Sequence, residues 1–168
     1  MTAAATTTRQ FLTFTLAGEP FALDIGLVRE IIGYDPPTRV PAAPAQVRGV
    51  INLRGTVIPV IDLAIRLGAA PTPVGMRTCI LVAQARVAGE LTVLGLVVDA
   101  IRDVIEIADA DIEPAPTLSA RVPPELLLGL AREDGRFLHL LDLQRALEED
   151  ARLPLHAPAP APAAAAGT

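Results

Sequence analysis

The feature that most constrains the fold is a pair of apolar runs separated by Arg54-Gly55. The runs at residues 50–53 and 57–63 are rich in valine and isoleucine, and β-branched side chains favour the pleated surface of a sheet. Gly55 can adopt a positive φ without a steric clash, so the chain can reverse direction there. The pattern predicts a β-hairpin whose turn holds Asn52 and Arg54 at the surface.

Pro59 lies inside the second run and restricts where that strand can sit. Proline has no N–H to donate to a neighbouring strand, so within sheets it is found at edges, at strand starts or at bulges. We therefore expect the strand that contains Pro59 to lie at an edge of its sheet or next to a β-bulge.

The hairpin pattern occurs a second time. Aligning residues 49–67 with 129–147 without a gap pairs Gly49 with Gly129 and Asp62 with Asp142. Further pairs in this alignment are Gly55 with Gly135, Leu63 with Leu143, and residues 27–32 with 100–105 at a slightly shorter offset. We interpret the chain as two related β-rich subdomains with an internal repeat at about 10–68 and 77–150. The second copy is seven residues longer, and we place the insertion at 117–125.

The remaining elements follow from turn residues and apolar patterning. Hairpins are predicted at 10–16 with 21–25 and at 77–87 with 90–98, the second turning at Ala88-Gly89. Further strands are expected at 27–32, after a tight turn at 25–27, and at 101–107 and 136–141. Single helical turns are expected at 109–112, opened by an aspartate N-cap, and at 125–130.

Two short helices are predicted directly after the two hairpins. Asp62 and Asp142 are suitable N-caps for helices that run to Leu67 and through 143–150, and Gly68 ends the first. Residues 1–9 are expected to form a flexible leader. The Pro/Ala-rich residues 154–168 cannot bury a core and are expected to be disordered.

Composition excludes several classes of function. The 168 residues carry a net charge of −5, which gives no attraction to phosphate and argues against nucleic acid as a partner. No segment has the ~20 apolar residues needed to span a bilayer, and residues 1–10 lack the features of a signal peptide. The expectation is a cytoplasmic protein without membrane insertion. With one cysteine there can be no internal disulfide, and Cys79 is predicted to be a buried apolar residue.

The sequence offers no convincing catalytic or metal-binding constellation. The acidic residues that could act as general acids or bases each have a structural explanation; they are Asp24, Glu30, Asp62, Asp99 and Asp103. His139 and His156 have no Cys or His companions at ligand spacing. Phosphate-binding glycine loops and a nucleophile elbow are also missing from the sequence. We therefore predict no catalytic residues, no cofactor, no metal and no enzymatic activity.

Several motifs together resemble the CheW coupling proteins of bacterial chemotaxis across residues 10–153. They are F-A-L-D-I at 21–25, V-R-E-I-I-G-Y at 28–34, T-R-V-P at 38–41, G-V-I-N-L-R-G at 49–55, V-I-P-V-I-D-L at 57–63, G-L-V-V-D at 95–99 and I-E-P-A-P at 112–116. The resemblance implies a mostly β fold of two interleaved, SH3-like five-stranded β-barrel subdomains with short helices and a C-terminal helix. It also implies an adaptor that joins the cytoplasmic tip of methyl-accepting chemoreceptors to the regulatory domain of the histidine kinase CheA.

The resemblance also suggests where partners bind. Arg54 and its neighbours Asn52 and Leu53 match positions that contact the receptor tip, in a groove between the subdomains. Val28, Glu30 and Val104 match receptor-contacting positions as well. The kinase contact in the family uses apolar barrel ends, and the motifs do not assign residues to it. One departure is that relatives with D-L-R after the hairpin have an arginine where this chain has Ala64.

Two alternatives remain open from the sequence. The first is a CheW-like adaptor in a twitching-motility or other chemosensory-type pathway. The second is a small-barrel module that binds an oligosaccharide or nucleic acid, which would need a basic or aromatic stripe on one face. With 3% aromatic residues and an excess of acidic over basic side chains, the composition argues against the second alternative.

Overall fold

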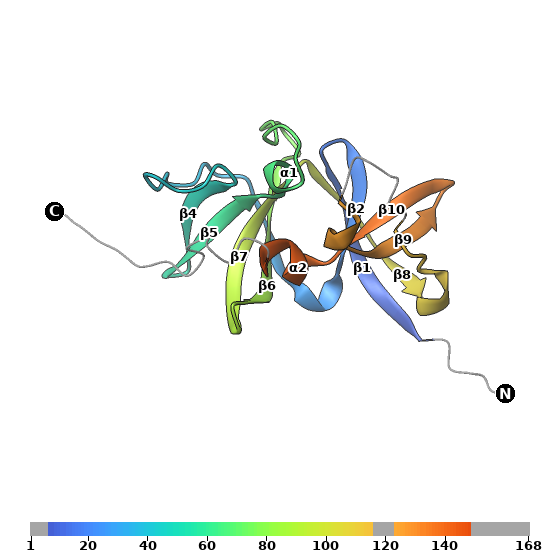
Figure 1. The fold of residues 1–168 in the computed structure, drawn as a ribbon. Helices are drawn as coiled ribbons and strands as arrows, with labels where there is room; N and C mark the ends of the chain where they lie inside the picture. Colours follow the sequence, from blue (N-terminus) through green and yellow to red (C-terminus); the bar gives the residue numbers. More distant parts are fainter. Residues whose placement is uncertain (1–6, 116–122, 149–168) are drawn as a thin grey trace.

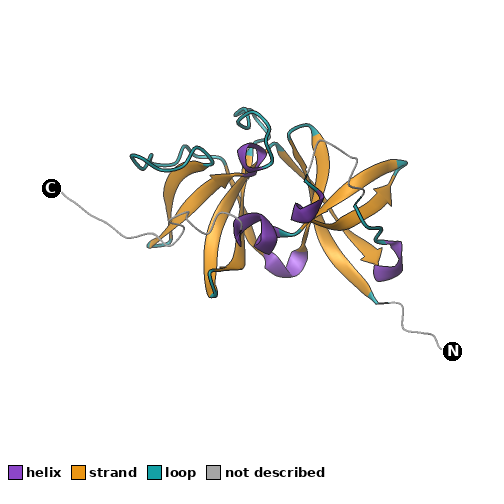
Figure 2. Cartoon of the chain, viewed as in Figure 1, coloured by secondary structure: helices purple, strands orange, loops and turns teal. Residues whose placement is uncertain are grey.

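The computed structural model describes residues 7–115 and 123–148, and this part of the chain is mostly β-structure. Ten strands form two five-stranded sheets, and the helices are short (Figures 1 and 2). The elements are β1 (Thr8–Leu16), β2 (Glu19–Asp24), β3 (Val28–Gly33), β4 (Val47–Leu53), β5 (Thr56–Asp62), α1 (Leu63–Arg66), β6 (Cys79–Val87), β7 (Glu90–Val98), β8 (Ala100–Ala108), β9 (Leu127–Glu133), β10 (Arg136–Leu141) and α2 (Leu143–Glu148), with 3₁₀ turns at Ile25–Leu27, Asp109–Asp111 and Pro124–Leu126.

The two sheets have the same topology. The first, here called sheet A, has the order β8-β1-β2-β10-β9, and the second, sheet B, has the order β3-β6-β7-β5-β4. Each sheet contains one parallel pair of strands, which is β2 with β10 in sheet A and β5 with β7 in sheet B. The other neighbouring strands in both sheets are antiparallel. Each therefore combines two strands from one half of the chain with three strands from the other half.

Both sheets curl, so that their two edge strands approach one another. In sheet B the chain that follows β3 makes a bridge at Thr38 to Val50 of β4, with both hydrogen bonds at 2.8 Å. In sheet A, Glu113 after β8 makes the same bridge to Leu130 of β9. Within the described residues neither strand order closes into a hydrogen-bonded ring, so each sheet remains open with a single bridge across the opening.

Glycine makes the two bridges possible. Gly49 and Gly129 have φ of 147° and 157°, in a region that side chains disfavour. A Cβ atom on either glycine would overlap the carbonyl oxygen of Thr38 or Glu113 respectively. The glycines at these equivalent positions thus allow the close approach of the bridging segment.

The apolar side chains form one shared core and one smaller core inside each sheet. The shared core contains Phe14 from sheet A and Leu96 from sheet B, together with leucines of α1 and α2. Figure 1 shows these two helices between the sheets. Phe11 belongs to the core inside sheet A, and Val60 to the core inside sheet B. Because β1 sends Phe11 and Phe14 to different cores, both of its faces are buried.

The predicted caps and hairpins are confirmed. The Asp62 carboxylate accepts a hydrogen bond from the Ala64 N–H, and the Asp142 carboxylate accepts one from the Arg145 N–H. Each aspartate thus begins a short helix. Gly68, at a φ of 89°, follows the end of α1. The central hairpin pairs β4 with β5, and the expected hairpins β1–β2 and β6–β7 are also present.

The prediction for Pro59 was half right. Its strand, β5, lies between β7 and β4 and is not at an edge. However, the β4–β5 register shifts between Val47 and Gly49, next to the Val50–Pro59 pair, so the bulge alternative is correct. Pairing of β5 with β7 begins at Val60. Pro59 therefore needs no N–H on that side.

Some local predictions were wrong. Residues 127–130 were expected in a helical turn but belong to β9, because their backbone pairs with β10, and only Pro124–Leu126 forms a turn. The turn at Asp109–Asp111 has Ala108 at its N-cap position and no side-chain cap. Cys79 is only half-buried, at the first position of β6, with its thiol 3.3 Å from the Arg77 carbonyl oxygen. The predicted tail at 154–168 and most of the predicted insertion lie outside the described residues.

Candidate protein-docking site

A bidentate ion pair joins two of the residues that the sequence analysis singled out. The Arg54 guanidinium donates from Nη1 to Glu30 Oε2 at 2.6 Å and from Nη2 to Oε1 at 2.7 Å. The Arg54 side chain is 72% exposed and that of Glu30 is 27% exposed. Parallel N–H···O bonds of this kind fix the mutual orientation of both groups as well as their separation.

The tight turn of the β4–β5 hairpin positions Arg54. Arg54 and Gly55 have φ of 51° and 87°, the pair of positive values that is typical of a two-residue hairpin loop. The Asn52 side-chain oxygen accepts a hydrogen bond from the Gly55 N–H at 2.8 Å and so stabilises the turn from within. Asn52 is thus exposed but has a structural function.

The ion pair connects the two edges of sheet B. Glu30 lies on β3 and Arg54 follows β4, and these strands are at opposite ends of the hydrogen-bonded order. The pair therefore closes the side of the curled sheet that the Thr38–Val50 bridge does not reach. The β3–β6 register shifts between Val28 and Glu30, and this bulge changes the direction of the edge strand just before the glutamate.

The charges of the ion pair affect each other's protonation. Hydrogen bonding from Arg54 is the main cause that lowers the pKa of Glu30; desolvation is the next largest effect and opposes it, and the charges of Arg54 and Arg29 lower the pKa further. Hydrogen bonding to Glu30 raises the pKa of Arg54. Both directions favour the charged forms, so the ion pair stays intact at neutral pH.

A small cavity opens beside the ion pair. It has a volume of about 200 Å³ and is lined by Arg29, Glu30, Leu53, Arg54, Thr56, Ile58, Val82 and Val93. The apolar members belong to the core inside sheet B or pack against it, and the charged members stand at the rim. A cavity with an apolar wall and a charged rim is suited to an apolar side chain of a protein partner.

The other predicted contact residues lie apart from this cavity. Val28 is half-buried at the start of β3 and packs against the shared core. Val104 lies on β8 in sheet A with 51% of its surface exposed. The structure thus brings Glu30, Leu53 and Arg54 together around one cavity, supported by Asn52, and leaves Val104 on the other sheet.

Sequence reasoning missed Arg48, which holds a buried carboxylate. Asp62 is completely buried, and its Oδ2 accepts hydrogen bonds from Arg48 Nε at 3.1 Å and Nη2 at 3.0 Å. Thr72, in the segment between the repeats, donates to Asp62 from both its N–H and its hydroxyl. Arg48 also bonds the Tyr34 hydroxyl and the Thr72 carbonyl. The sequence signal was a charged residue at the start of an apolar strand.

The replacement of the family arginine by Ala64 has a structural explanation. Ala64 is fully buried in the shared core, where a charged side chain would be costly without partners. Arg66, two residues later, donates from Nε to the Ala146 carbonyl of α2 at 2.9 Å. The arginine of this segment thus links α1 to α2.

No group of three or more His, Cys, Asp or Glu side chains that could hold a metal ion occurs in residues 7–115 and 123–148. None of the helices in these ranges has the length and apolarity needed to cross a bilayer. His139 packs against the Phe21 ring, and its Nδ1 lies 2.9 Å from the Pro20 carbonyl oxygen.

The protein is thus a β domain of two five-stranded sheets, with the Glu30–Arg54 ion pair joining the two edges of sheet B. A family model for the CheW-like domain matches residues 10–151. The chain therefore belongs to the CheW-like family.

Relatives over most of the chain agree with this assignment. A probable chemotaxis protein CheW of Rhizobium etli is 39% identical over 84% of this chain and 88% of its own length. The chemotaxis protein CheW of Rhizobium meliloti is 36% identical over 86% of this chain and 90% of its own length. The crystal structure of the scaffolding protein TtCheW from Thermoanaerobacter tengcongensis matches with a TM-score of 0.76 and 29% identity, covering 91% of this chain and 96% of the other.

Proposed function

We propose that this protein is a non-enzymatic adaptor that couples methyl-accepting chemoreceptors to the histidine kinase CheA in a bacterial chemotaxis signalling array. Membership of the CheW-like family and relatives that are chemotaxis and scaffolding proteins support this function. We further propose a cytoplasmic location, with membrane association only through the receptor.

The observation that carries the receptor contact is the Glu30–Arg54 ion pair beside its cavity. Both residues match receptor-contacting positions of the family, and the ion pair presents a rigid charged rim next to the apolar wall formed by Leu53, Ile58 and Val82. An apolar side chain from a receptor tip would enter the cavity, and polar groups beside it would bond to the rim. We place Asn52 in a supporting role, and Val28 and Val104 at the margins of the contact.

We also propose that each curled sheet is an SH3-like barrel in the sense of the family. The bridge at Thr38–Val50 and the core inside sheet B support this description for one unit. The bridge at Glu113–Leu130 and the core inside sheet A support it for the other.

Binding of a receptor fragment tests the proposed function. The wild-type protein should bind both a receptor signalling fragment and the regulatory domain of the kinase. Arg54→Glu places two carboxylates opposite each other at the rim, so receptor binding should weaken strongly, and kinase binding should be unchanged. Circular dichroism should show that the variant is folded, because Arg54 is an exposed turn residue.

Arg77→Glu is the matched control, since it makes the same charge change at another exposed position. Unchanged receptor binding by a folded Arg54→Glu variant would exclude the receptor site proposed here. A wild-type protein that binds neither partner would exclude the adaptor function itself.

A further inference from the structure

A β-bulge on β3 brings a second arginine to the cavity of about 200 Å³ in sheet B. Val28 pairs with Ala83 of β6, but Glu30 pairs with Val82, so Arg29 is an extra residue between two paired positions. Consecutive residues of a regular strand point to opposite faces of the sheet, whereas a bulge re-aims a side chain. Because of this bulge, Arg29 and Glu30 both line the cavity although they are neighbours in the chain.

A side-chain hydrogen bond holds Arg29 on the cavity side of the sheet. Its Nη1 donates to Gln84 Oε1 at 2.9 Å. Gln84 lies two residues from Val82 on β6, so both side chains point to the same face of the sheet. Val82 forms part of the cavity wall. The Arg29 guanidinium is therefore fixed beside the cavity, and its side chain is exposed to a partner.

The rim of this cavity carries an uncompensated positive charge. Of the described residues that line the cavity, two are arginines and one is a glutamate, which gives a net charge of +1. The Glu30 carboxylate uses both of its oxygens to bind Arg54. Arg29 bonds only to a neutral amide oxygen, and it makes no ion pair within residues 7–115 and 123–148. The rim thus has one cation more than it has carboxylates.

The cation and the apolar wall together define a ligand chemistry. Leucine, isoleucine and valine side chains from β4, β5, β6 and β7 form the wall. A carboxylate that meets a guanidinium makes a charge-assisted hydrogen bond, and an apolar side chain in the cavity would keep water away from that bond. A lysine or arginine at the same place would meet a like charge and be rejected.

We propose that Arg29 is a specificity-determining residue of the receptor contact, and that it binds a carboxylate of the receptor tip next to the apolar side chain that enters the cavity. This inference rests on the proposed function and deepens it by naming the charge that the receptor presents at this point. Gln84 is a positioning residue, because it acts by holding the Arg29 guanidinium.

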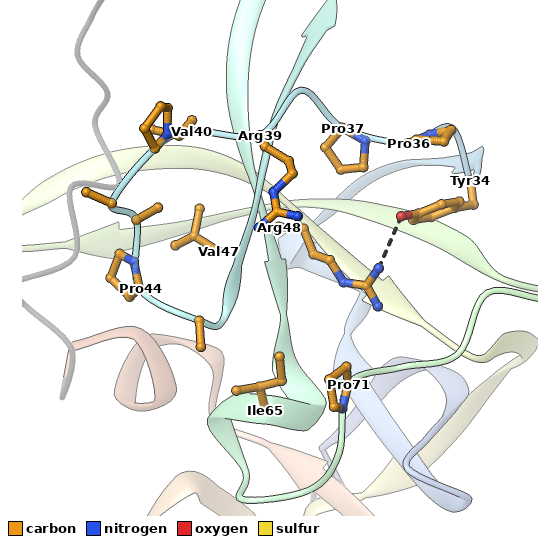
Figure 3. A pocket seen from close by; sticks show the side chains of 14 residues that line it. Tyr34, Pro36, Pro37, Arg39, Val40, Pro44, Val47, Arg48, Ile65 and Pro71 are labelled. Carbon is orange, nitrogen blue, oxygen red and sulfur yellow. Dashed lines mark hydrogen bonds between the residues drawn. The ribbon is translucent and has the colours of Figure 1, made fainter.

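A larger, proline-lined groove in the same sheet supplies a matched control. It has a volume of about 620 Å³, and Pro71 lines it together with four prolines of the segment 34–45 (Figure 3). Arg39 also lines this groove and is exposed. Tyr34, at one end of the groove in Figure 3, is five residues from Arg29, about 17 Å along an extended strand. Arg39→Gln therefore changes the net charge as Arg29→Gln does, but at another surface.

Titration of a receptor signalling fragment against purified full-length variants tests the inference. Arg29→Gln should weaken receptor binding about tenfold, because a hydrogen bond between charged groups is lost. The affinity of this variant should also depend less on salt concentration than that of wild type. Arg39→Gln should leave receptor binding within about twofold of wild type, and Arg29→Gln should leave binding of the kinase regulatory domain within the same limit. Circular dichroism should show that both variants are folded.

Double-mutant cycles test the two assigned roles separately. Gln84→Ala should weaken receptor binding about threefold in the wild-type background and have no further effect in Arg29→Gln. In the receptor fragment, the carboxylates of the tip are converted to amides one at a time. One of these changes should weaken binding to wild type and leave binding to Arg29→Gln unchanged. If the effects of all of them simply add to that of Arg29→Gln, no carboxylate faces Arg29 and the inference is overturned.

The remaining outcomes separate this inference from the proposed function. Wild-type affinity and salt dependence in folded Arg29→Gln, together with weak binding by Arg54→Glu, would overturn the role of Arg29 and leave the receptor site standing. Equal weakening by Arg39→Gln would show that overall charge is responsible and would also overturn it. So would an equal loss of kinase binding by Arg29→Gln, because the effect would then not be specific to the receptor.

Discussion

The turns of the two equivalent hairpins share a backbone and differ in chemistry. Arg54 and Gly55 have φ of 51° and 87°, and Asp134 and Gly135 have φ of 53° and 77°. Two residues with positive φ allow a tight loop whose twist matches that of the flanking strands. Both turns have glycine at the second position, where positive φ costs least, and a different charged residue at the first, so the exposed side chain has diverged on a common backbone.

The divergence gives the two turns different contacts. Arg54 makes a bidentate ion pair with Glu30 across the opening of sheet B. In sheet A, Arg132 packs 5.2 Å from the Phe137 ring centroid and makes a longer ion pair of 3.7 Å with Glu113. The ion pair in sheet A thus starts from strand β9 and not from the turn, and only the pair in sheet B has close, bidentate geometry. The comparison shows how one frame can carry two different surfaces.

The two hairpins also differ where each one leads into its helix. Asp62 is buried and is paired with Arg48, whereas Asp142 is half-buried and caps α2. The position that corresponds to Arg48 in the repeat is Leu128, which is 41% exposed. One copy thus uses an ionic network where the other has an apolar side chain.

The largest effect should come from the buried ion pair. Arg48→Met leaves the Asp62 carboxylate buried with only the N–H and hydroxyl of Thr72 and the cap bond as partners, so the free energy of unfolding should fall by about 3 kcal/mol or more. Leu128→Met, at the corresponding position, should change it by less than about 0.5 kcal/mol. Urea unfolding followed by circular dichroism measures both, and equal effects would show that the network contributes nothing specific.

A smaller but symmetric effect is expected at the bridging glycines. Gly49→Ala and Gly129→Ala each place a Cβ against a backbone carbonyl at a disfavoured φ, so each should reduce the free energy of unfolding by about 2 kcal/mol. Gly33→Ala is the control, because a Cβ there meets open space. Thermal unfolding compares the three variants. A tolerated substitution in only one copy would mean that the two bridges are not equivalent.

The loops after β3 and β8 differ in strain. Ala42 has a φ of 64°, whereas the described residues 109–115 after β8 contain no positive φ. Because glycine adopts this conformation without steric cost, Ala42→Gly should raise the free energy of unfolding by up to about 1 kcal/mol. The gain is limited because glycine also makes the unfolded chain more flexible. A clear loss of stability in urea unfolding would contradict this explanation.

The smallest effect should be the pH dependence of the Glu30–Arg54 ion pair. Since Arg54 lowers the pKa of Glu30, the stability from the ion pair is fully present above the pKa of glutamate in the unfolded chain. It is lost as the pH falls through the lower pKa of the folded protein. The difference in Tm between wild type and Glu30→Gln should therefore shrink as the pH is lowered through the acidic range.

Glu113→Gln is the matched variant in sheet A and should change Tm less at neutral pH, because its ion pair is longer. A pH-independent difference between wild type and Glu30→Gln would show that Glu30 acts by packing and not by charge.

Much of the local structure could be predicted from the sequence. The hairpins at β1–β2, β4–β5 and β6–β7 follow from alternating apolar residues and from turns such as Arg54-Gly55 and Ala88-Gly89. The N-caps Asp62 and Asp142 follow from their position before a short apolar helix. These features depend on residues close together in the chain, so local propensity decides them.

Features that depend on distant residues were harder to predict. Residues 127–130 look helical in isolation, but pairing with β10 makes them a strand, and the central place of Pro59 depends on where the parallel pairing with β7 begins. For the site, the motifs indicated both Glu30 and Arg54, yet nothing local showed that they pair. Arg48 was missed because its partner Asp62 already had a local explanation as a helix cap.

By itself, the sequence determined the strand-forming segments, the turn positions, the helix caps and the resemblance to the CheW-like family. Only the tertiary structure decided which edges meet: it placed Glu30 opposite Arg54, Arg48 beside Asp62, and Arg39 over a proline-lined groove. The physical reason is that propensities and caps act over a few residues. Curling a sheet, in contrast, brings together side chains from opposite edges, and their contacts depend on the packing of the whole core.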